Sequence, residues 1–277
     1  MPSSMEYWKQ RVLAHNDQTI KVREGFGGTE DFWRPVVSHF TDDPHRTNDP
    51  VLNRILHEVS PEATVLDVGG GAGRYALPLA LDCRHITVVE PSGAMIEALQ
   101  KAAQEASIHN LTTIQSTWED ARDEAADVVL CASVVDGVAK VEPFIRKLEL
   151  CAREKVLILQ SMVSPWAMIA PFWKAVRGEN PVLPPAAPEL LSVLWEMDIY
   201  PDVQMIETPP RTAQDKEAAL ALLRQAIFIQ PETDKDKRLQ EAMHELIIET
   251  PAGLTMKGAG PRRIALISWG QNSGWKR

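Results

Sequence analysis

Short apolar runs alternate with amphipathic stretches over most of the chain beyond residue 63. The apolar runs are rich in Val, Ile and Leu and occupy residues 64–68, 86–90, 111–115, 127–132 and 155–160. A parallel sheet that is buried on both faces has strands that read as near-continuous apolar runs, joined by amphipathic helices. The pattern therefore predicts an α/β fold.

Helical patterns dominate the first sixty residues and cover residues 6–15, 31–40 and 49–59. In the third of these segments Asp49 precedes Pro50, the arrangement of an N-cap residue followed by proline at the first helical position. Apolar residues recur at helical spacing along one face of this segment, so we expect that face to pack on the sheet. The residues of the face are Val51, Ile55, Leu56 and Val59.

The chain is less regular after the fifth apolar run. Residues from about 163 to 200 carry two helical pieces around a proline-rich turn, which predicts a helical cap inserted into the sheet domain. Apolar runs at 203–207 and 262–269 predict two further strands, and the patterns at 216–228 and 235–248 predict helices.

The composition of the chain disfavours nucleic-acid-binding, secreted and membrane-spanning proteins. The chain of 277 residues carries 29 basic and 38 acidic residues, a formal net charge of -9, which makes a broad nucleic-acid-binding face unfavourable. Cys83, Cys131 and Cys151 are odd in number and lie in apolar surroundings, as buried thiols of a reducing compartment do. No apolar run has the length of a membrane span or of a secretory signal, so we expect a cytoplasmic protein without a membrane partner.

A glycine-rich turn directly follows the first predicted strand, which ends at Asp67 and Val68. Its glycines are Gly69, Gly70, Gly71 and Gly73. Glycine lets the backbone turn sharply and approach a ligand closely, and the helix that follows offers unpaired N–H groups to a carboxylate or phosphate. The turn therefore predicts a ligand with an anionic group, and Asp67 supplies a negative charge for an ammonium group.

A second acid closes the next strand. Glu90 lies about 20 residues beyond the glycines, the spacing at which an acid accepts hydrogen bonds from ribose hydroxyls. Pro91 and Ser92 follow and can cap a helix, and Met95 offers a soft apolar side chain to an adenine face. At the end of the third strand, a carboxylate or amide can accept from the adenine amino group while Trp118 shields the ring.

These residues resemble the class I S-adenosylmethionine-dependent methyltransferases, whose D-x-G-x-G-x-G turn is matched by Asp67 and the glycines after it. The resemblance extends to Glu90, to Met95 and to the corner at residues 118–120, and it covers roughly residues 50–165. It implies a three-layer Rossmann-like fold with a mostly parallel seven-stranded sheet whose last strand is antiparallel. It also implies that residues 131–135, after the fourth strand, border the transferred methyl group.

The resemblance also implies how the chain is divided and which residues bind the cofactor. Residues 1–60 form a helical extension or lid, and residues 61–277 form the domain that binds S-adenosylmethionine, with the cap inserted in it. The expected cofactor-binding residues are Asp67, Gly69, Gly70, Gly71, Gly73, Glu90, Pro91, Met95, Thr117, Trp118, Glu119, Cys131 and Ala132.

Other functions share parts of this pattern. Gly71, Gly73 and Ala76 also satisfy the G-x-G-x-x-A spacing of dinucleotide-binding proteins, so a nicotinamide-dependent oxidoreductase is an alternative. Asp67 favours S-adenosylmethionine over that alternative. A subunit that binds the cofactor without transferring its methyl group is a further alternative, because no residue stands out as a base.

Candidate bases are His39, which follows the aromatic pair at residues 32–33, and Asp136, which follows the fourth strand. Either residue also fits a plain role in a helix surface or a turn. Thiol, amine and heterocyclic nitrogen acceptors need no dedicated base, whereas a hydroxyl acceptor needs a base or a metal. The histidines lack metal-ligand spacing, so we predict no metal site.

The acceptor is predicted to be a small molecule. The segment after the fourth strand is neither the Asn/Asp-Pro-Pro-Tyr/Phe motif nor the Pro-Cys pair that the family uses on exocyclic amines and pyrimidine carbons. An RNA or protein methyltransferase remains an alternative within the enzyme class. Trp33, Trp166 and Trp173 are candidate acceptor contacts, and core packing or the packing of a homodimer explains them equally well.

Overall fold

A computed structural model describes residues 2–23, 26, 31–122 and 124–270 and contains a seven-stranded sheet in the order β3-β2-β1-β4-β5-β9-β6. Its last strand, β9, pairs antiparallel with β5 and β6, and the other pairs are parallel. The mostly parallel sheet of seven strands and its antiparallel last strand are confirmed. The strands are β1 Thr64–Val68, β2 His85–Glu90, β3 Leu111–Gln115, β4 Ala126–Ala132, β5 Ala152–Ser161, β6 Asp202–Thr208 and β9 Arg262–Gly270.

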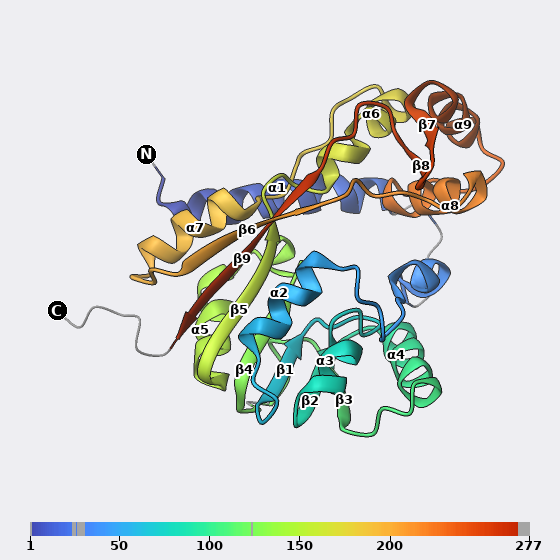
Figure 1. Ribbon diagram of the computed structural model, residues 1–277. Helices are drawn as coiled ribbons and strands as arrows, with labels where there is room; N and C mark the ends of the chain where they lie inside the picture. Colours follow the sequence, from blue (N-terminus) through green and yellow to red (C-terminus); the bar gives the residue numbers. More distant parts are fainter. Residues whose placement is uncertain (1, 24–25, 27–30, 123, 271–277) are drawn as a thin grey trace.

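Helices cover both faces of the sheet, which gives three layers (Figure 1). Neighbouring residues of β1 point to opposite faces, so that Val65 belongs to one apolar cluster and Leu66 to the other. The helices on the Val65 face are α2 Pro50–Glu58, α3 Ala76–Asp82 and α4 Gly93–Glu105, and those on the Leu66 face are α1 Ser4–Arg23, α5 Val141–Cys151 and α7 Ala187–Glu196.

The predicted capping of α2 is confirmed. The Asp49 carboxylate accepts hydrogen bonds from the backbone N–H groups of Val51 at 3.0 Å and Leu52 at 3.1 Å, which satisfies two donors at the helix start. Val51 and Ile55 are buried in the apolar cluster of the sheet. The expectation that this helix packs on the sheet is therefore also confirmed.

A further helical layer has an apolar core of its own, in which Phe172 and Trp173 are the largest buried side chains. Figure 1 shows α1, α6, α8 and α9 in the upper part of the view, and α2, α3 and α4 in the lower part. The remaining elements are α6 Trp166–Arg177, α8 Lys216–Ala226, α9 Asp234–Leu246, the strands β7 Ile247–Thr250 and β8 Gly253–Met256, and the 3-10 helices η1 Arg34–Phe40 and η2 Val135–Gly137. Among the residues described, no helix has the length and apolar character of a membrane span.

Three local predictions differ from the structure. The expected helix at 31–40 is the shorter 3-10 helix η1, with a proline at its second residue. The helix expected to reach residue 248 ends at Leu246, because Ile247 and Ile248 instead pair as a β-hairpin with Met256 and Thr255. The predicted cap does not form one unit, since α6 lies in the core of the helical layer and α7 packs on the sheet.

Candidate functional site

The glycine turn between β1 and α3 has the backbone conformation that glycine favours. Gly69, Gly71 and Gly73 have φ values of +71°, +56° and +85°, which residues with a side chain rarely adopt. The N–H of Gly69 donates to the Val89 carbonyl of the neighbouring strand at 2.7 Å. The turn is thus fixed to the end of β2 as well as to β1.

Close packing under the turn explains why side chains are absent from it. A Cβ atom added at Gly70 would lie 2.7 Å from the Asp67 Oδ2 atom and from a Val88 methyl group, closer than real contacts allow. At Gly71 an added Cβ would meet only the Met95 sulfur, at 4.0 Å. The turn is therefore packed below Gly70 and comparatively open at Gly71, with Met95 beside it.

Asp67 is a buried carboxyl group that lacks a complete set of partners. It is 1% exposed, and its Oδ1 atom accepts no hydrogen bond from any residue that the structure describes. Burial and, to a smaller extent, the charge of Glu90 raise the pKa of Asp67 to about 7. A bound ammonium group would satisfy this oxygen and favour its ionised form, so Asp67 fits the amino group of the expected cofactor.

Glu90 links the glycine turn to the start of α4. Its Oε2 atom accepts from the N–H of Gly71 at 3.0 Å, and its Oε1 atom accepts from the N–H of Ser92 at 2.9 Å. Burial raises the pKa of Glu90, and these two hydrogen bonds act against that rise. Each carboxylate oxygen can accept a further hydrogen bond, so the ribose diol of the expected cofactor fits this side chain.

The start of α4 has the predicted cap, with the Ser92 hydroxyl accepting from the Met95 N–H at 3.1 Å. A second acid, Asp31, also binds the start of α4, and the sequence did not predict it. The Asp31 carboxylate accepts from the Ser92 hydroxyl at 2.8 Å and from the N–H of Ala94 at 2.9 Å. Asp31 is 61 residues from Ser92, and no local spacing in the sequence indicates the contact.

The three predicted residues after β3 differ in their exposure to solvent. Thr117 and Glu119 are exposed, and the Thr117 hydroxyl donates to the Asp120 carboxylate at 2.8 Å. Trp118 is 4% exposed, its Nε1 atom donates to the Phe144 carbonyl, and the Lys147 ammonium lies 4.6 Å from its ring centre. The indole therefore packs toward α5, under the corner.

The carboxyl ends of β1 and β4 lie against each other, because an added Cβ at Gly69 would be 2.5 Å from a methyl carbon of Val134. Cys131 is fully buried, and its burial raises the pKa of the thiol well above the usual value, whereas Ala132 is half-buried. Asp136 is half-buried and close to Gln160, whose side chain donates a hydrogen bond to it. Burial raises the pKa of Asp136 despite that hydrogen bond.

The other candidate residues lie on η1, near its start, in the helical layer and at the end of β2. His39 is exposed on η1, and Trp33 is 38% exposed with its ring against Phe32 and Phe40. Trp173 is fully buried in the helical layer, with the ring of half-buried Trp166 at a centroid distance of 5.8 Å. Pro91 is exposed at the end of β2.

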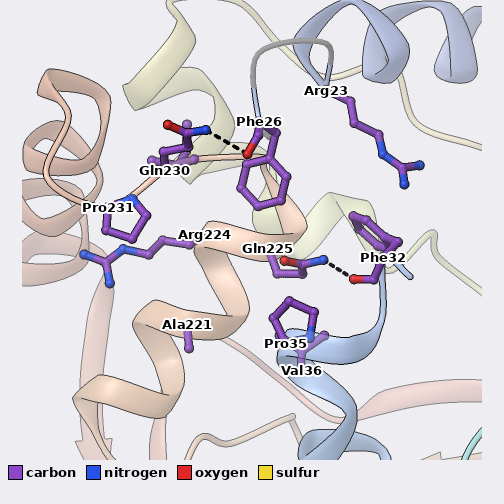
Figure 2. A pocket seen from close by; sticks show the side chains of 11 residues that line it. Arg23, Phe26, Phe32, Pro35, Val36, Ala221, Arg224, Gln225, Gln230 and Pro231 are labelled. Carbon is purple, nitrogen blue, oxygen red and sulfur yellow. Dashed lines mark hydrogen bonds between the residues drawn. The ribbon is translucent and has the colours of Figure 1, made fainter. Parts of the chain in front are cut away.

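A cavity of about 490 Å³ lies between α8 and the chain segment that carries Phe26 and Phe32. Figure 2 shows how two amide side chains connect its walls. Gln225 donates to the Phe32 carbonyl at 2.5 Å, and Gln230 donates to the Phe26 carbonyl at 2.9 Å. The lining is largely aromatic and apolar and includes two arginines. The Arg23 guanidinium lies 4.6 Å from the Phe32 ring centre, and Arg224 pairs with Asp236.

Comparisons with known sequences relate the part of the chain that contains the glycine turn to methyltransferases. Residues 66–158 match the family model described as a methyltransferase domain. An uncharacterized protein of Haemophilus influenzae is 28% identical over 84% of this chain and 85% of its own length. A ubiquinone biosynthesis O-methyltransferase of Rickettsia felis is 32% identical over 38% of this chain, and the alignment spans only 45% of that relative.

Solved structures share the fold. An S-adenosylmethionine-dependent methyltransferase of Geobacter sulfurreducens, in complex with S-adenosyl-L-homocysteine, is 18% identical with a TM-score of 0.54 over 86% of this chain and 97% of that one. The YcgJ protein of Bacillus subtilis is 18% identical with a TM-score of 0.55, over 80% of this chain and 98% of that one. At this identity the likeness establishes the fold.

Proposed function

We propose that this chain is a class I S-adenosylmethionine-dependent methyltransferase that transfers the methyl group to a small molecule, because residues 66–158 match the methyltransferase-domain model and the fold is that of such enzymes. The observation that carries the proposal is the cavity beside Phe32, whose volume of about 490 Å³ lies within the roughly 300–1,000 Å³ of small-molecule pockets. Its aromatic and apolar lining suits an organic acceptor. The net charge of -9 disfavours a long nucleic-acid acceptor, and the O-methylation named for the Rickettsia relative agrees with a small one.

Asp67 and Glu90 divide the recognition of the cofactor between them. Asp67 receives the ammonium group on its unpartnered Oδ1 atom, and Glu90 accepts hydrogen bonds from the ribose diol. Gly71 leaves room for the methionine moiety before α3, and Gly69 and Gly70 are expected to contact it through their backbone. The remaining expected contacts are Gly73 in the turn, Pro91, Met95, Thr117, Trp118 and Glu119 on the adenine side, and Cys131 and Ala132 beside the methyl group.

Positioning is the main contribution of this chain to the reaction. The bound cofactor supplies an activated methyl group on its sulfonium, and holding an acceptor in line with it is worth roughly 7–11 kcal/mol. Asp136 is our candidate base for an acceptor that must lose a proton. Its raised pKa makes the ionised carboxylate a stronger base, and the hydrogen bond from Gln160 positions it. His39 is exposed on η1 and is the second candidate.

We assign residues 1–60 the role of a lid over the cofactor domain at 61–277. Asp31 is hydrogen-bonded to the start of α4, and Arg34 pairs with Glu97 of the same helix at 3.0 Å, which supports this role. The Trp33 ring contacts Phe32, which lines the cavity, so Trp33 is the favoured acceptor contact among the three tryptophans. The buried thiols of Cys83, Cys131 and Cys151 support a reducing, cytoplasmic location.

Calorimetry with S-adenosyl-L-homocysteine tests the cofactor site. We expect binding to the wild-type protein and at least about tenfold weaker binding to Glu90→Gln, which loses a charged acceptor for the ribose. Glu105→Gln is the matched control, because Glu105 is an exposed residue at the far end of α4. Wild-type protein that releases no heat of binding would overturn the assignment.

The acceptor class is tested with methyl-labelled S-adenosylmethionine. Cell extract is divided into a low-mass filtrate, total RNA and total protein, and each is incubated with the enzyme. We expect label in the filtrate, with loss of the transfer in Glu90→Gln. Label only in RNA or protein would contradict a small-molecule acceptor, and no label in any fraction would favour a non-catalytic cofactor-binding subunit.

A further inference from the structure

Four arginines from distant parts of the sequence gather at the carboxyl edge of the sheet. Arg74 directly follows the glycine turn, Arg46 precedes α2, Arg211 follows β6 and Arg262 begins β9. The strand register brings the last two together, because Arg262 pairs with Thr208, three residues before Arg211. Helix α2 packs on β6, and its N-terminal end lies at the carboxyl edge of the sheet. Arg46 and Arg74 are therefore at the same edge as Arg211 and Arg262.

Hydrogen bonds fix the positions of Arg46, Arg74 and Arg262. Arg74 donates to the Asp49 carboxylate at 3.4 Å and pairs with Asp42 at 3.4 Å. Arg46 binds the same Asp49 carboxylate at 3.2 Å and donates to the Arg74 carbonyl at 2.7 Å. On the other side, the Arg262 Nε atom donates to the Pro209 carbonyl at 3.0 Å, which holds its side chain beside the segment that leads to Arg211.

The cluster carries more positive than negative charge. Its two acids, Asp42 and Asp49, both pair with Arg46 and Arg74. Neither Arg211 nor Arg262 forms an ion pair with a residue that the structure describes. Burial, followed by the charges of Arg262 and Arg74, lowers the pKa of Arg211, and burial with the charge of Arg74 lowers that of Arg262. The strand register places Arg262 beside the segment that leads to Arg211, and the positive charges there disfavour one another.

An anion between these groups would relieve the repulsion. Guanidinium groups bind carboxylates and phosphates with paired N–H donors, and such charge-assisted hydrogen bonds are about twice as strong as neutral ones. Neighbouring segments surround the Arg211 guanidinium and partly desolvate it, but the residue as a whole is exposed, so a ligand can reach it. None of its side-chain donors is used by a described residue. The excess positive charge is also local, since the whole chain has a net charge of -9.

We propose that Arg74, Arg211 and Arg262 bind a carboxylate or phosphate group of the methyl acceptor. The position supports this, because Arg74 adjoins the glycine turn and Arg262 lies at the same edge of the sheet as the carboxyl ends of β1 and β4. The inference rests on the proposed methyl transfer and adds to it the charge of the acceptor. The carboxylate of the cofactor itself has the same chemistry, so the experiment separates the two sources.

Inorganic phosphate is the probe, titrated by calorimetry at constant ionic strength into the full-length protein with and without saturating S-adenosyl-L-homocysteine. We expect phosphate to bind in both conditions, and Arg211→Gln to weaken it at least about tenfold, the loss of one charge-assisted interaction. Arg263→Gln is the matched control. Arg263 is the exposed neighbour of Arg262 in β9, and it pairs with Glu207 outside the cluster.

Each result has a single meaning for the proposal. Phosphate binding that S-adenosyl-L-homocysteine abolishes would assign the cluster to the cofactor carboxylate and overturn an acceptor site. Equal phosphate affinity in Arg211→Gln, Arg263→Gln and wild-type protein, or no phosphate binding at all, would overturn it as well. Retained binding of S-adenosyl-L-homocysteine by Arg211→Gln shows that the variant is folded, and failure of that ligand with wild-type protein would instead contradict the cofactor site.

Discussion

The glycine-turn edge of the sheet and the helical layer each contain a buried polar atom that has no hydrogen-bond partner among the described residues, but the two atoms have different surroundings. Asp67 Oδ1 lies beside a turn whose glycines have positive φ and leave space at Gly71. Trp173 Nε1 lies in an apolar core, beside Phe172 and with the Arg177 guanidinium 4.7 Å from its ring centre. The first atom can be completed by a ligand, whereas the second is enclosed by packing.

The different surroundings predict that one residue acts in ligand binding and the other in stability. A buried carboxyl group without a partner is unfavourable in the free protein, so it indicates a place where a ligand supplies the missing donor. An unpaired indole N–H is offset by the large apolar area that the ring buries, about 150–250 Å². Asp67 should therefore control affinity for the cofactor, and Trp173 should control folding.

Replacing Trp173 by alanine should have the largest effect. The fully buried indole is the main side chain of the helical-layer core, and its loss should lower the free energy of unfolding by about 3–5 kcal/mol. Urea unfolding measures this change. Calorimetry under folding conditions should give an affinity for S-adenosyl-L-homocysteine within about twofold of wild type. A variant with normal stability would show that the ring is not a core residue.

Replacing Asp67 by asparagine should have the opposite pattern. The variant keeps the shape of the side chain and loses its charge, so affinity for S-adenosyl-L-homocysteine should fall by about ten- to a hundredfold, the value of one charge-assisted hydrogen bond. The free energy of unfolding at pH 8 should not fall, because the buried carboxylate no longer has to ionise. Unchanged affinity would remove Asp67 from the cofactor site.

The pH dependence of binding should show the smallest effect. Burial raises the pKa of Asp67 in the free protein to about 7, so an ammonium ligand must displace its proton below that pH. Affinity for S-adenosyl-L-homocysteine should thus increase by about tenfold from pH 6 to pH 8. The raised pKa of Asp67 contributes stability to the free protein that is fully present below the unfolded pKa of about 4 and is lost as the pH rises to about 7.

Asp67→Asn is the control for this profile. In the variant the affinity should be nearly independent of pH between 6 and 8, apart from the contribution of Glu90, whose pKa is also raised by burial. A wild-type profile that coincides with that of the variant would show that Asp67 does not exchange its proton for the ligand.

The sequence predicted the sheet domain well because its signals are local. The apolar runs at 64–68 and 111–115 coincide with β1 and β3, and the glycine turn has the positive φ values that only glycine adopts readily. The N-cap of α2 at Asp49 and that of α4 at Ser92 were likewise predictable, because each side chain caps N–H groups within three residues. These features depend on neighbours in the chain.

The helical layer and parts of the site were not predictable in the same way. Tryptophans at helical spacing fit a core or a ligand site equally, and only the packing of α6 against α8 and α9 places Trp173 in a core. Similarly, nothing near residue 247 indicates that its strand finds a partner at Met256. The outcome depends on which apolar surfaces meet in the folded chain.

The sequence by itself therefore determined the fold class, the cofactor turn and the acids that accompany it, since strand runs, glycine conformations and caps follow from short-range sterics and periodicity. Tertiary structure alone decided that Asp31 meets Ser92 and that Arg262 lies beside the segment leading to Arg211. Such contacts join residues far apart in the chain. They leave no periodic pattern, because they form only when the packing of the sheet and its helices brings the segments together.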